Sequence, residues 1–331
     1  MAADAVRDVG DHAPGKPVAS VVICTRNRAE SLARCLRSLE LDESTTPAEV
    51  IVVDNGSTDE TPERIQAAAT LSRRPFVALR ETALGSSSAR NAGVRAAAGE
   101  FVLFADDDVV IHSGWIDALV AAFTPGVAAV GGRVLPRIAG QTPPWFTDER
   151  NSLTLWDDGP AVFDMTTERH PLGANMAVRR AVILSFSQPF HPRLGHVGGV
   201  RMAYEEVYLF AQILRDHRVV YAPDAVVDHM VDAERLTYEF TRRAHFHYGF
   251  GRARYQRLLG VPLPGLASRA NLAGRSYRYA LSLRFRHAHA RALEAEQANE
   301  EFMAYFAAGK NIEWLLGRWP KAAEWFARAL I

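Results

Sequence analysis

The sequence predicts an α/β protein in which a mostly parallel sheet, with helices on both faces, is followed by a helical C-terminal region. Short apolar runs alternate with helical stretches over residues 18–131, and helical patterns dominate from residue 234 onward. Strands that are apolar throughout are typical of a parallel sheet whose two faces are both covered. With 331 residues, of which 48% are apolar, the chain can bury a sizeable core.

Each element of the sheet region has its own local signal. The expected strands cover residues 18–24, 49–53, 76–79, 101–105 and 127–130. The expected helices cover residues 29–39, 87–98 and 113–123, together with a segment that opens at residue 61. Pro62 suits a first helical turn and Gly99 suits a helix end, so both support these boundaries.

The second half of the chain is less regular. Residues 133–175 contain prolines and turn signals, and we expect hairpins and loops there. The later expected elements are a helix over 204–216, a strand pair over 219–221 and 225–228, and helices from 234 to the end. The expected division is a disordered lead over 1–16, a domain over 17–232 with halves 17–131 and 132–232, and a helical region over 233–331.

Composition narrows the class of protein. The formal net charge is +0, so the chain as a whole has no attraction for nucleic acid, and no nucleic-acid-binding fold is recognised. Cys24 and Cys35 are too few for a disulfide framework and are expected to be small buried apolar residues. No apolar run approaches the roughly 20 residues needed to span a bilayer, and the N-terminus has no signal-peptide core. These features favour a cytoplasmic protein.

Polar residues follow three of the predicted strands, at 24–27, 54–57 and 106–108. In open α/β sheets, ligands bind beyond the carboxyl ends of the strands, so we expect these residues to form one binding rim. No Gly-x-Gly-x-x-Gly follows the first strand and no Gly-Lys-Ser/Thr loop occurs in the chain. A dinucleotide dehydrogenase and a P-loop NTPase are therefore disfavoured.

Two of these segments suggest chemistry. Asp106, Asp107 and Asp108 leave a buried strand side by side, where mutual repulsion makes a bound cation favourable. Carboxylate oxygens suit Mg²⁺ or Mn²⁺, which often join a few carboxylates to substrate phosphates; a solvated acidic turn is the alternative. Asp54, also at a strand end, can accept hydrogen bonds from a base or ribose, and Asp59 lies near the start of the next helix.

Four segments in order resemble the family 2 glycosyltransferases with the GT-A fold. They are residues 21–28, 54–61 and 85–93 and the acidic triplet, and the resemblance covers residues 18–232. It implies an inverting, metal-dependent transfer of a sugar from a nucleotide-diphosphate donor, with uridine expected as the nucleoside. The two halves of the domain would then bind the nucleotide and the sugar with its acceptor.

The resemblance also assigns residues to the donor. Thr25 and Arg26 would line the nucleotide pocket, and Asp54 would hydrogen-bond the uracil. Arg90 and Asn91 would lie against the nucleotide and its phosphates.

The acidic triplet matches the family's Asp-x-Asp motif. Asp106 would contact the ribose side and the metal, and Asp108 would bind the Mn²⁺ or Mg²⁺ that joins the donor phosphates, with Asp107 between them. His229, after the last predicted strand, is a second-rank ligand for this metal, and Asp228 is an alternative partner.

The resemblance places the catalytic base in residues 204–209, where Glu205 and Glu206 open a predicted helix. Acidic residues at a helix N-terminus can simply complement its dipole. The family usually has Glu-Asp here, with the second residue as the base. Glu206 would hold that position, and its extra methylene keeps the same chemistry; Glu205 is the other candidate.

Four further residues are expected near the transferred sugar or the acceptor. Gly173 and Asn175 lie in a recurring family segment beside the sugar. Trp156 and His196, the latter in a glycine-rich loop over 194–199, are expected to border the acceptor. A core position is the alternative for Trp156.

The C-terminal region is unusually basic, because residues 242–286 contain ten arginines and no Asp or Glu. This imbalance indicates either contact with an anionic membrane surface, lipid-linked acceptor or acidic glycan, or pairing with acids of the catalytic domain or a second subunit. The aromatic residues of an expected last helix over 311–330 suggest core or homodimer packing.

The sequence thus predicts a glycosyltransferase whose acceptor is a glycan, a lipid-linked sugar or a small molecule. A sugar-1-phosphate nucleotidyltransferase is the first alternative, although the loop at 24–27 lacks the glycine such an enzyme needs. The second is an inactive, membrane-associated binding subunit on the same fold, against which the complete acidic triplet and Glu206 argue.

Overall fold

The computed structural model describes residues 16–146, 157–197, 199–287, 295–317 and 319–329. Most of the expected lead over 1–16 lies outside these residues. The described chain forms two compact units. The first takes its residues from Met1–Arg137, Thr154–Pro192 and Glu205–Met230, and the second from Ile138–Leu153, Arg193–Tyr204 and Val231–Ile331. The second unit thus combines the C-terminal segment with two segments from the earlier half of the chain.

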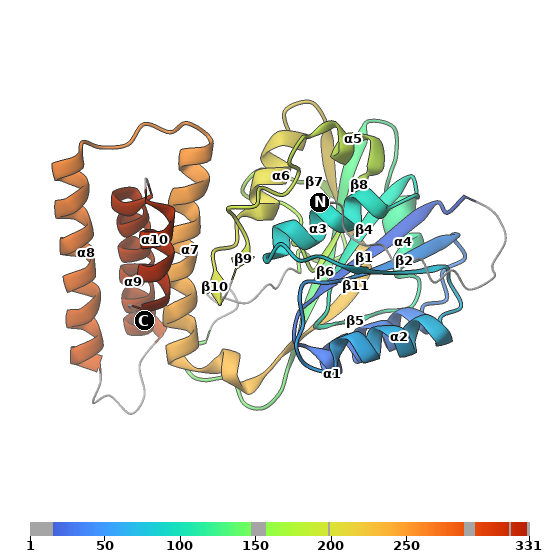
Figure 1. Ribbon diagram of the computed structural model, residues 1–331, viewed down its shortest axis with the longest axis horizontal. Helices are drawn as coiled ribbons and strands as arrows, with labels where there is room; N and C mark the ends of the chain where they lie inside the picture. The colour runs from blue at the N-terminus through green and yellow to red at the C-terminus, as the bar shows by residue number, and fades with distance from the viewer. Residues whose placement is uncertain (1–15, 147–156, 198, 288–294, 318, 330–331) are drawn as a thin grey trace. The chain divides into compact units, whose positions relative to one another are not determined.

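One large sheet forms the centre of the first unit (Figure 1). Its strands are β1 (Ala19–Thr25), β2 (Ala48–Asp54), β3 (Phe76–Arg80), β4 (Phe101–Asp106), β5 (Val109–Ile111), β6 (Val127–Ile138), β7 (Phe163–Asp164), β8 (Asn175–Arg179) and β11 (Arg218–Val231). The strand order is β3-β2-β1-β4-β8-β6-β11-β5, and β7 pairs with β11. The part from β3 to β4 is parallel, whereas β8 pairs antiparallel with both β4 and β6.

Helices cover both faces of this sheet, as the continuous apolar strands predicted. One face packs against α1 (Ala29–Glu40), α2 (Thr61–Leu71) and α4 (Trp115–Ala121), and the other against α3 (Ser86–Ala96), α5 (Arg180–Ser185) and α6 (Glu205–Ile213). Val21 and Ile23 of β1 belong to the first of these cores, and Val22 between them belongs to the second. This alternation follows from the strand period of two, and it explains why β1 has no polar face.

The expected strand at 127–130 lies within β6, which runs in the same direction as β4 but is separated from it by the antiparallel strand β8. One sequence expectation about the strands needs correction. The expected pair at 219–221 and 225–228 is one long strand, β11, that continues through Pro223. Proline and aspartate suggested a turn there, but a proline is accommodated wherever a strand needs no amide donor.

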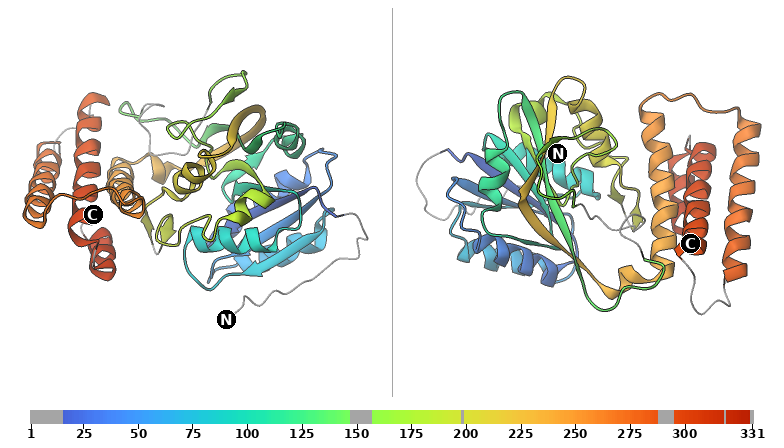
Figure 2. Two further views of the ribbon diagram at one scale, coloured as in Figure 1. Left: turned by 90° about the horizontal axis from the view of Figure 1, so that it is seen from above. Right: turned by 180° about the vertical axis from the view of Figure 1, so that it is seen from behind.

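The second unit contains a small hairpin, β9 (His196–Val197) with β10 (Val200–Arg201), a short 3₁₀ helix, η2 (Ala233–Leu236), and four α-helices. The helices are α7 (Tyr238–Leu258), α8 (Leu266–His287), α9 (Ala295–Leu316) and α10 (Pro320–Ala329), drawn from orange to red in Figure 2. Close contact of α7 with α9 depends on two glycines. A Cβ on Gly249 would lie 1.9 Å from the carbonyl oxygen of Phe306, and one on Gly309 would lie 2.0 Å from that of Phe246.

Two buried glutamates of α9 neutralise several of the arginines. Glu313 accepts hydrogen bonds from Arg254 at 3.1 Å and from Arg257 at 3.1 Å, and its side chain is 0% exposed. Glu301 lies 3.8 Å from Arg242 and is equally buried. These carboxylate partners of Arg242, Arg254 and Arg257 therefore belong to the same helical unit as the arginines.

The expected single helix over 311–330 is also corrected, because α9 ends at Leu316 and α10 begins at Pro320. Proline is favoured at the first position of a helix, where no amide donor is needed. Within the residues that the structure describes, no helix has the length and apolar character required to cross a membrane.

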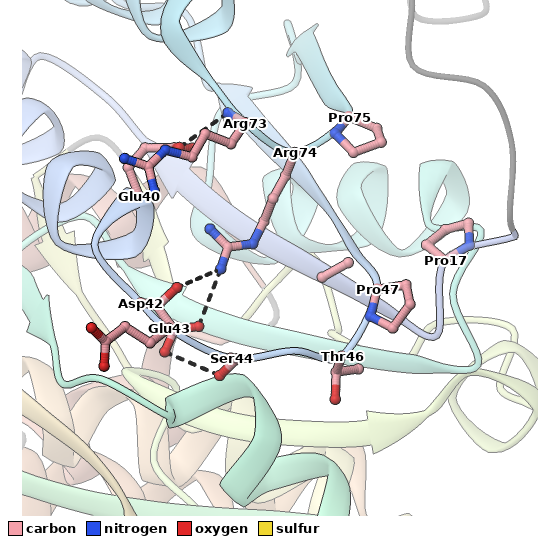
Figure 3. A pocket seen from close by; sticks show the side chains of 11 residues that line it. Pro17, Glu40, Asp42, Glu43, Ser44, Thr46, Pro47, Arg73, Arg74 and Pro75 are labelled. Carbon is pink, nitrogen blue, oxygen red and sulfur yellow. Dashed lines mark hydrogen bonds and ion pairs between the residues drawn. The ribbon is translucent and has the colours of Figure 1, made fainter.

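A surface hollow of the first unit lies where the parallel strands begin (Figure 3). The hollow is lined by Pro47 and Pro75, which directly precede β2 and β3, and by Pro17, two residues before β1. Arg74 donates hydrogen bonds there to the carbonyl oxygens of Leu39, at 2.9 Å, and Asp42, at 2.9 Å. This arginine therefore links the end of α1 to the start of β3. The hollow lies at the edge of the sheet opposite the predicted binding rim, and we assign a structural role to its polar residues.

Candidate active site

The strand register brings the predicted rim residues into one row. Thr25 is the register partner of Asp54, and Cys24 is the register partner of Asp106. All four residues lie at the carboxyl ends of β1, β2 and β4, where a ligand of such a sheet is expected.

The three aspartates that end β4 have different partners. Asp106 accepts a hydrogen bond from Nη2 of Arg90 at 3.0 Å. Asp107 accepts hydrogen bonds from the hydroxyl of Thr25 at 2.7 Å and from Nη1 of Arg28 at 2.7 Å. Burial and the charge of Asp108 raise the pKa of Asp107 to about 6, against the opposing effect of Arg28.

Asp108 lies between a cation and an imidazole. Its Oδ2 accepts a hydrogen bond from Nη1 of Arg28 at 2.8 Å, and its Oδ1 lies 3.4 Å from Nε2 of His229. His229 is 2% exposed and lies on β11 opposite Val109 of β5, which immediately follows the triplet. The predicted alternative, Asp228, instead meets His112 at 2.9 Å and Arg137 at 3.8 Å.

The Asp108–His229 pair fits a divalent cation. Two donors 3.4 Å apart can both lie within the ~2.1 Å that an ion such as Mg²⁺ requires of its ligands. Within the described residues no group of three or more His, Cys, Asp or Glu side chains is arranged to hold a metal. Mg²⁺ commonly binds through one or two protein carboxylates and completes its coordination with substrate phosphates and water.

A second acidic group lies at the start of α6. Glu205 accepts hydrogen bonds from Nη1 of Arg90 at 3.0 Å and from the hydroxyl of Ser86 at 3.0 Å. Glu206 places Oε1 3.8 Å from the same Arg90 nitrogen. Arg90 thus joins Asp106 at the end of β4 to both glutamates.

Gly173 leaves the space that this arrangement needs. A Cβ at residue 173 would lie 2.4 Å from Nη2 of Arg90 and 2.7 Å from Oε1 of Glu206. Heavy atoms do not approach so closely, so any side chain here would displace one of the two charged groups.

The two glutamates differ in environment. The Glu205 side chain is 4% exposed and that of Glu206 is 18% exposed. Burial and the neighbouring charge of Glu205 raise the pKa of Glu206 to about 8, against the opposing effect of Arg90. A carboxylate with a raised pKa that still reaches solvent can take a proton from a substrate hydroxyl near neutral pH.

The loop after β2 is held in shape by its own polar groups. Asp54 accepts a hydrogen bond from the amide of Ser57 at 2.8 Å, which closes the turn. Asn27, in the left-handed region at φ 52, accepts a hydrogen bond from the amide of Thr58 at 2.7 Å. These bonds join the loops after β1 and β2, and Arg26 is exposed beside them.

Two predicted donor-binding residues, Asn91 and Asn175, form hydrogen bonds within the protein that stabilise the fold. Asn91 exchanges two hydrogen bonds with the backbone of Phe190, at 2.7 and 3.2 Å. Asn175 is 0% exposed, and its side chain meets Trp115 at 2.8 Å and the carbonyl oxygens of Arg133 and Ala225 at 2.9 and 2.8 Å. Asn175 therefore has no surface through which to meet a nucleotide sugar.

Of the two predicted acceptor residues, Trp156 lies outside the described residues. His196 begins β9 of the second unit and its side chain is exposed.

Sequence reasoning missed Arg28 and Ser86. Arg28 contacts two of the three aspartates, and Ser86 holds Glu205. Arg28 could have been found from its position, because it lies three residues after the end of β1, at the same edge of the sheet as the acidic triplet. No local signal indicated Ser86, because 119 residues separate it from its partner.

A comparison of the sequence with known protein families identifies the family of this chain. The family described as glycosyl transferase family 2 matches residues 20–185, half of the chain. The chain belongs to glycosyl transferase family 2. The alternative of a sugar-1-phosphate nucleotidyltransferase is not favoured, and the activity is that of a glycosyltransferase with a nucleotide-sugar donor.

Individual members of the family and of the fold agree with this assignment. The glucosyl-dolichyl phosphate glucuronosyltransferase of Haloferax volcanii is 26% identical over 239 residues, which is 70% of this chain and 75% of that protein. The mannosyltransferase PcManGT of Pyrobaculum calidifontis, solved with GDP-Man and Mn²⁺, superposes with a TM-score of 0.53 at 18% identity over 96% of this chain and 78% of its own. GalNAc-T7, solved with UDP, GalNAc and Mn²⁺, gives a TM-score of 0.52 at 16% identity over 88% and 57%. The predicted GT-A fold, with a helical C-terminal region, is confirmed.

Proposed function

We propose that this family 2 glycosyltransferase transfers a sugar from a UDP-linked donor to a hydroxyl group with inversion at the anomeric carbon. The observation that carries the proposal is the bridge that Arg90 makes between the acidic end of β4 and the Glu205–Glu206 pair. One acidic group suits a donor diphosphate with its cation, and the other suits the acceptor hydroxyl.

The donor side is assigned to the ends of β1, β2 and β4. The row at the strand ends includes Thr25 and Asp54, and Arg26 lies beside it. The hydrogen bond to Ser57 fixes the turn at Asp54, and a fixed polar side chain here suits recognition of a nucleoside. Uridine is proposed from the resemblance of these segments to the family. Of the two fold neighbours described above, one was solved with UDP and the other with GDP-Man, so the base requires its own test.

A divalent ion, Mn²⁺ or Mg²⁺, would be held by Asp108 and His229, with Asp106 on the ribose side. It would supply positive charge against the diphosphate that leaves the sugar. The hydroxyl of Thr25 holds Asp107 through a hydrogen bond of 2.7 Å, which positions Asp106 and Asp108 on either side of it.

Glu206 is proposed as the general base. Its ionised carboxylate accepts the proton of the acceptor hydroxyl while the oxygen attacks the anomeric carbon. The bond between that carbon and the diphosphate oxygen breaks on the opposite face, so the anomeric configuration is inverted. Glu205 stays paired with Arg90 and Ser86 and keeps the helix start in position.

A lipid-linked acceptor at a membrane surface is proposed for the acceptor side. The relative from Haloferax volcanii is named for a dolichyl phosphate substrate. On α8, Arg275 and Arg278 are exposed together with Phe285, which is 74% exposed. A helix with exposed cations and an aromatic residue suits the interface of an anionic leaflet. Co-sedimentation with anionic but not neutral vesicles, lost in Arg275→Gln/Arg278→Gln, would support this contact.

Homodimer formation is proposed for another surface of the helical unit. Trp319 is 55% exposed and Trp325 is 63% exposed, which suits contact with a second copy. Light scattering on the intact protein and on Trp325→Ser measures it directly. A monomer at all concentrations would contradict this proposal.

The function is tested with a panel of nucleotide sugars in the presence of Mn²⁺ or Mg²⁺. A ligand that binds only the native state raises the melting temperature with its saturation. The donor that gives the largest shift is then supplied with acceptors, and NMR of the product reads its anomeric configuration. Retention of configuration would contradict the direct displacement, and an absence of any metal-dependent shift would favour a binding subunit without activity.

A further inference from the structure

Arg28 occupies an unusual position at the rim. A single nitrogen, Nη1, lies 2.7 Å from Oδ1 of Asp107 and 2.8 Å from Oδ2 of Asp108. The two carboxylates are 7% and 9% exposed, whereas the Arg28 side chain is 33% exposed. A partly exposed cation therefore bridges two buried anions at the point where the donor phosphates are expected.

The bridge has a clear physical reason. Two adjacent carboxylates in a buried environment repel each other, and a buried charge without a partner is strongly destabilising. Arg28 supplies a positive charge that offsets both buried carboxylates at the end of β4.

Arg28 and a metal would compete for the same carboxylate. A divalent ion on Oδ1 of Asp108 would place two further positive charges close to Nη1 of Arg28, and like charges this close repel. Loss of the Arg28 bond would also free Oδ2 of Asp108 to take part in coordination. Arg28 therefore opposes metal binding as long as its guanidinium stays on Asp108.

The loop allows the side chain, but not the backbone, to change partner. The Arg28 amide donates to the hydroxyl of Thr61 at 3.1 Å, and the amide of Asn27 donates to the hydroxyl of Ser57 at 2.9 Å. With the backbone fixed, rotation of the exposed part of the side chain moves the guanidinium toward solvent, where a diphosphate offers several oxygens to its planar donors.

We propose that Arg28 is a resident cation which holds Asp107 and Asp108 in the donor-free enzyme and transfers to the donor diphosphate when metal and nucleotide bind together. The proposal rests on the metal site proposed above. It predicts opposite effects of Arg28 on two equilibria: it weakens the binding of Mn²⁺ alone and strengthens the binding of nucleotide with Mn²⁺. An ordinary phosphate-binding arginine would affect only the second.

Titration of the full chain with Mn²⁺, followed by the electron paramagnetic resonance of the free ion, tests both effects with and without UDP. Arg28→Gln is expected to bind Mn²⁺ alone about tenfold more tightly than the wild type, and to bind UDP with Mn²⁺ about tenfold more weakly. Arg28→Lys, which keeps a cation, is expected to stay close to the wild type for Mn²⁺ alone. Arg64→Gln removes an exposed arginine of α2 and serves as the matched control.

Asp108→Asn separates failure of this inference from failure of the metal site. If Asp108→Asn binds Mn²⁺ as the wild type does, the ion lies elsewhere and the proposed metal site is wrong. If Asp108→Asn loses the ion but Arg28→Gln binds Mn²⁺ alone no more tightly than the wild type, the metal site stands and the role of Arg28 is overturned. Melting temperatures of all variants without ligand confirm that each is folded.

Discussion

Nη1 of Arg90 lies 3.0 Å from Oε1 of Glu205, and the two side chains are 8% and 4% exposed. This buried ion pair separates the roles of two adjacent glutamates. Glu205 has its charge balanced inside the protein, whereas Glu206 lies farther from the same nitrogen and is more exposed. A proton acceptor must reach solvent and substrate, so the relationship favours Glu206 over Glu205 as the base.

Replacement of Glu206 by Gln is expected to lower kcat by about 10²–10⁴-fold, the usual contribution of a general base. The amide keeps the size of the side chain but cannot accept the proton. The measurement is initial-rate kinetics with a matched donor and acceptor, with donor binding followed by thermal shift as the control. Full turnover by Glu206→Gln would assign the base elsewhere.

The pH dependence follows from the direction of the pKa shift at Glu206. Its pKa is raised from 4.5 to about 8, so the folded protein holds a proton that the unfolded chain releases at lower pH. The contribution of this group to stability is therefore greatest at low pH and is lost as pH rises from about 4.5 to 8. Because only the ionised form acts as a base, kcat/KM is expected to rise over the same window.

Melting curves and kcat/KM profiles from pH 5 to 9 check both trends. Glu206→Gln lacks the titrating group, so its stability should vary less with pH than that of the wild type. A kcat/KM profile of the wild type that is flat over this range would show that another group limits the reaction.

Introduction of a methyl group at residue 173 is expected to separate Arg90 from Glu206. Gly173→Ala places a carbon where only 2.4 Å is available to Arg90, and overpacking of this kind typically costs about 1–3 kcal/mol. We expect a lower melting temperature and a loss of turnover. Gly140→Ala, where a Cβ meets nothing within 4 Å, controls for glycine replacement at an open position, although its φ of 108 adds strain of its own.

Asp108→Asn and His229→Gln are expected to remove the stabilisation that Mn²⁺ gives in the presence of UDP. Each change removes one of the two proposed metal ligands. The effect of Asp108→Asn should be the larger of the two, because this change removes an anionic ligand. Thermal shift with UDP, with and without Mn²⁺, measures it. An unchanged shift in both variants would place the ion outside this pair.

Glu313→Gln is expected to destabilise the helical unit strongly. Arg254 is 2% exposed and would lose the carboxylate that balances it, and removal of one partner from a buried ion pair costs about 3–5 kcal/mol. Glu296→Gln, at another exposed glutamate of the same helix, is the matched control. Equal melting temperatures for the two variants would mean that other groups balance Arg254.

The parallel half of the sheet and its acidic rim could be predicted from the sequence because their signals are local. The runs that became β1, β2 and β4 are mostly apolar, and polar residues occur at or directly after the end of each of them. Strands of this type end at one edge, so the neighbourhood of Asp54 and Asp106 needed no knowledge of the rest of the fold.

The remainder of the site depends on contacts between distant parts of the chain. Arg90 meets Glu205 across 115 residues, and Arg28 meets Asp108 across 80. Which strand lies beside β4 is also a nonlocal choice, and the neighbour there is β8, which follows β6 in the chain. No periodicity carries such information, since periodicity reports only which face of an element is buried.

The ion pairs of α9 constrain when the helical unit can fold during translation. Arg254 and Arg257 are synthesised well before Glu313, and Arg242 well before Glu301. A nascent chain that ends inside α8 therefore carries these guanidinium groups without the carboxylates that later enclose them. The helical unit therefore cannot complete its interior until translation has passed Glu313.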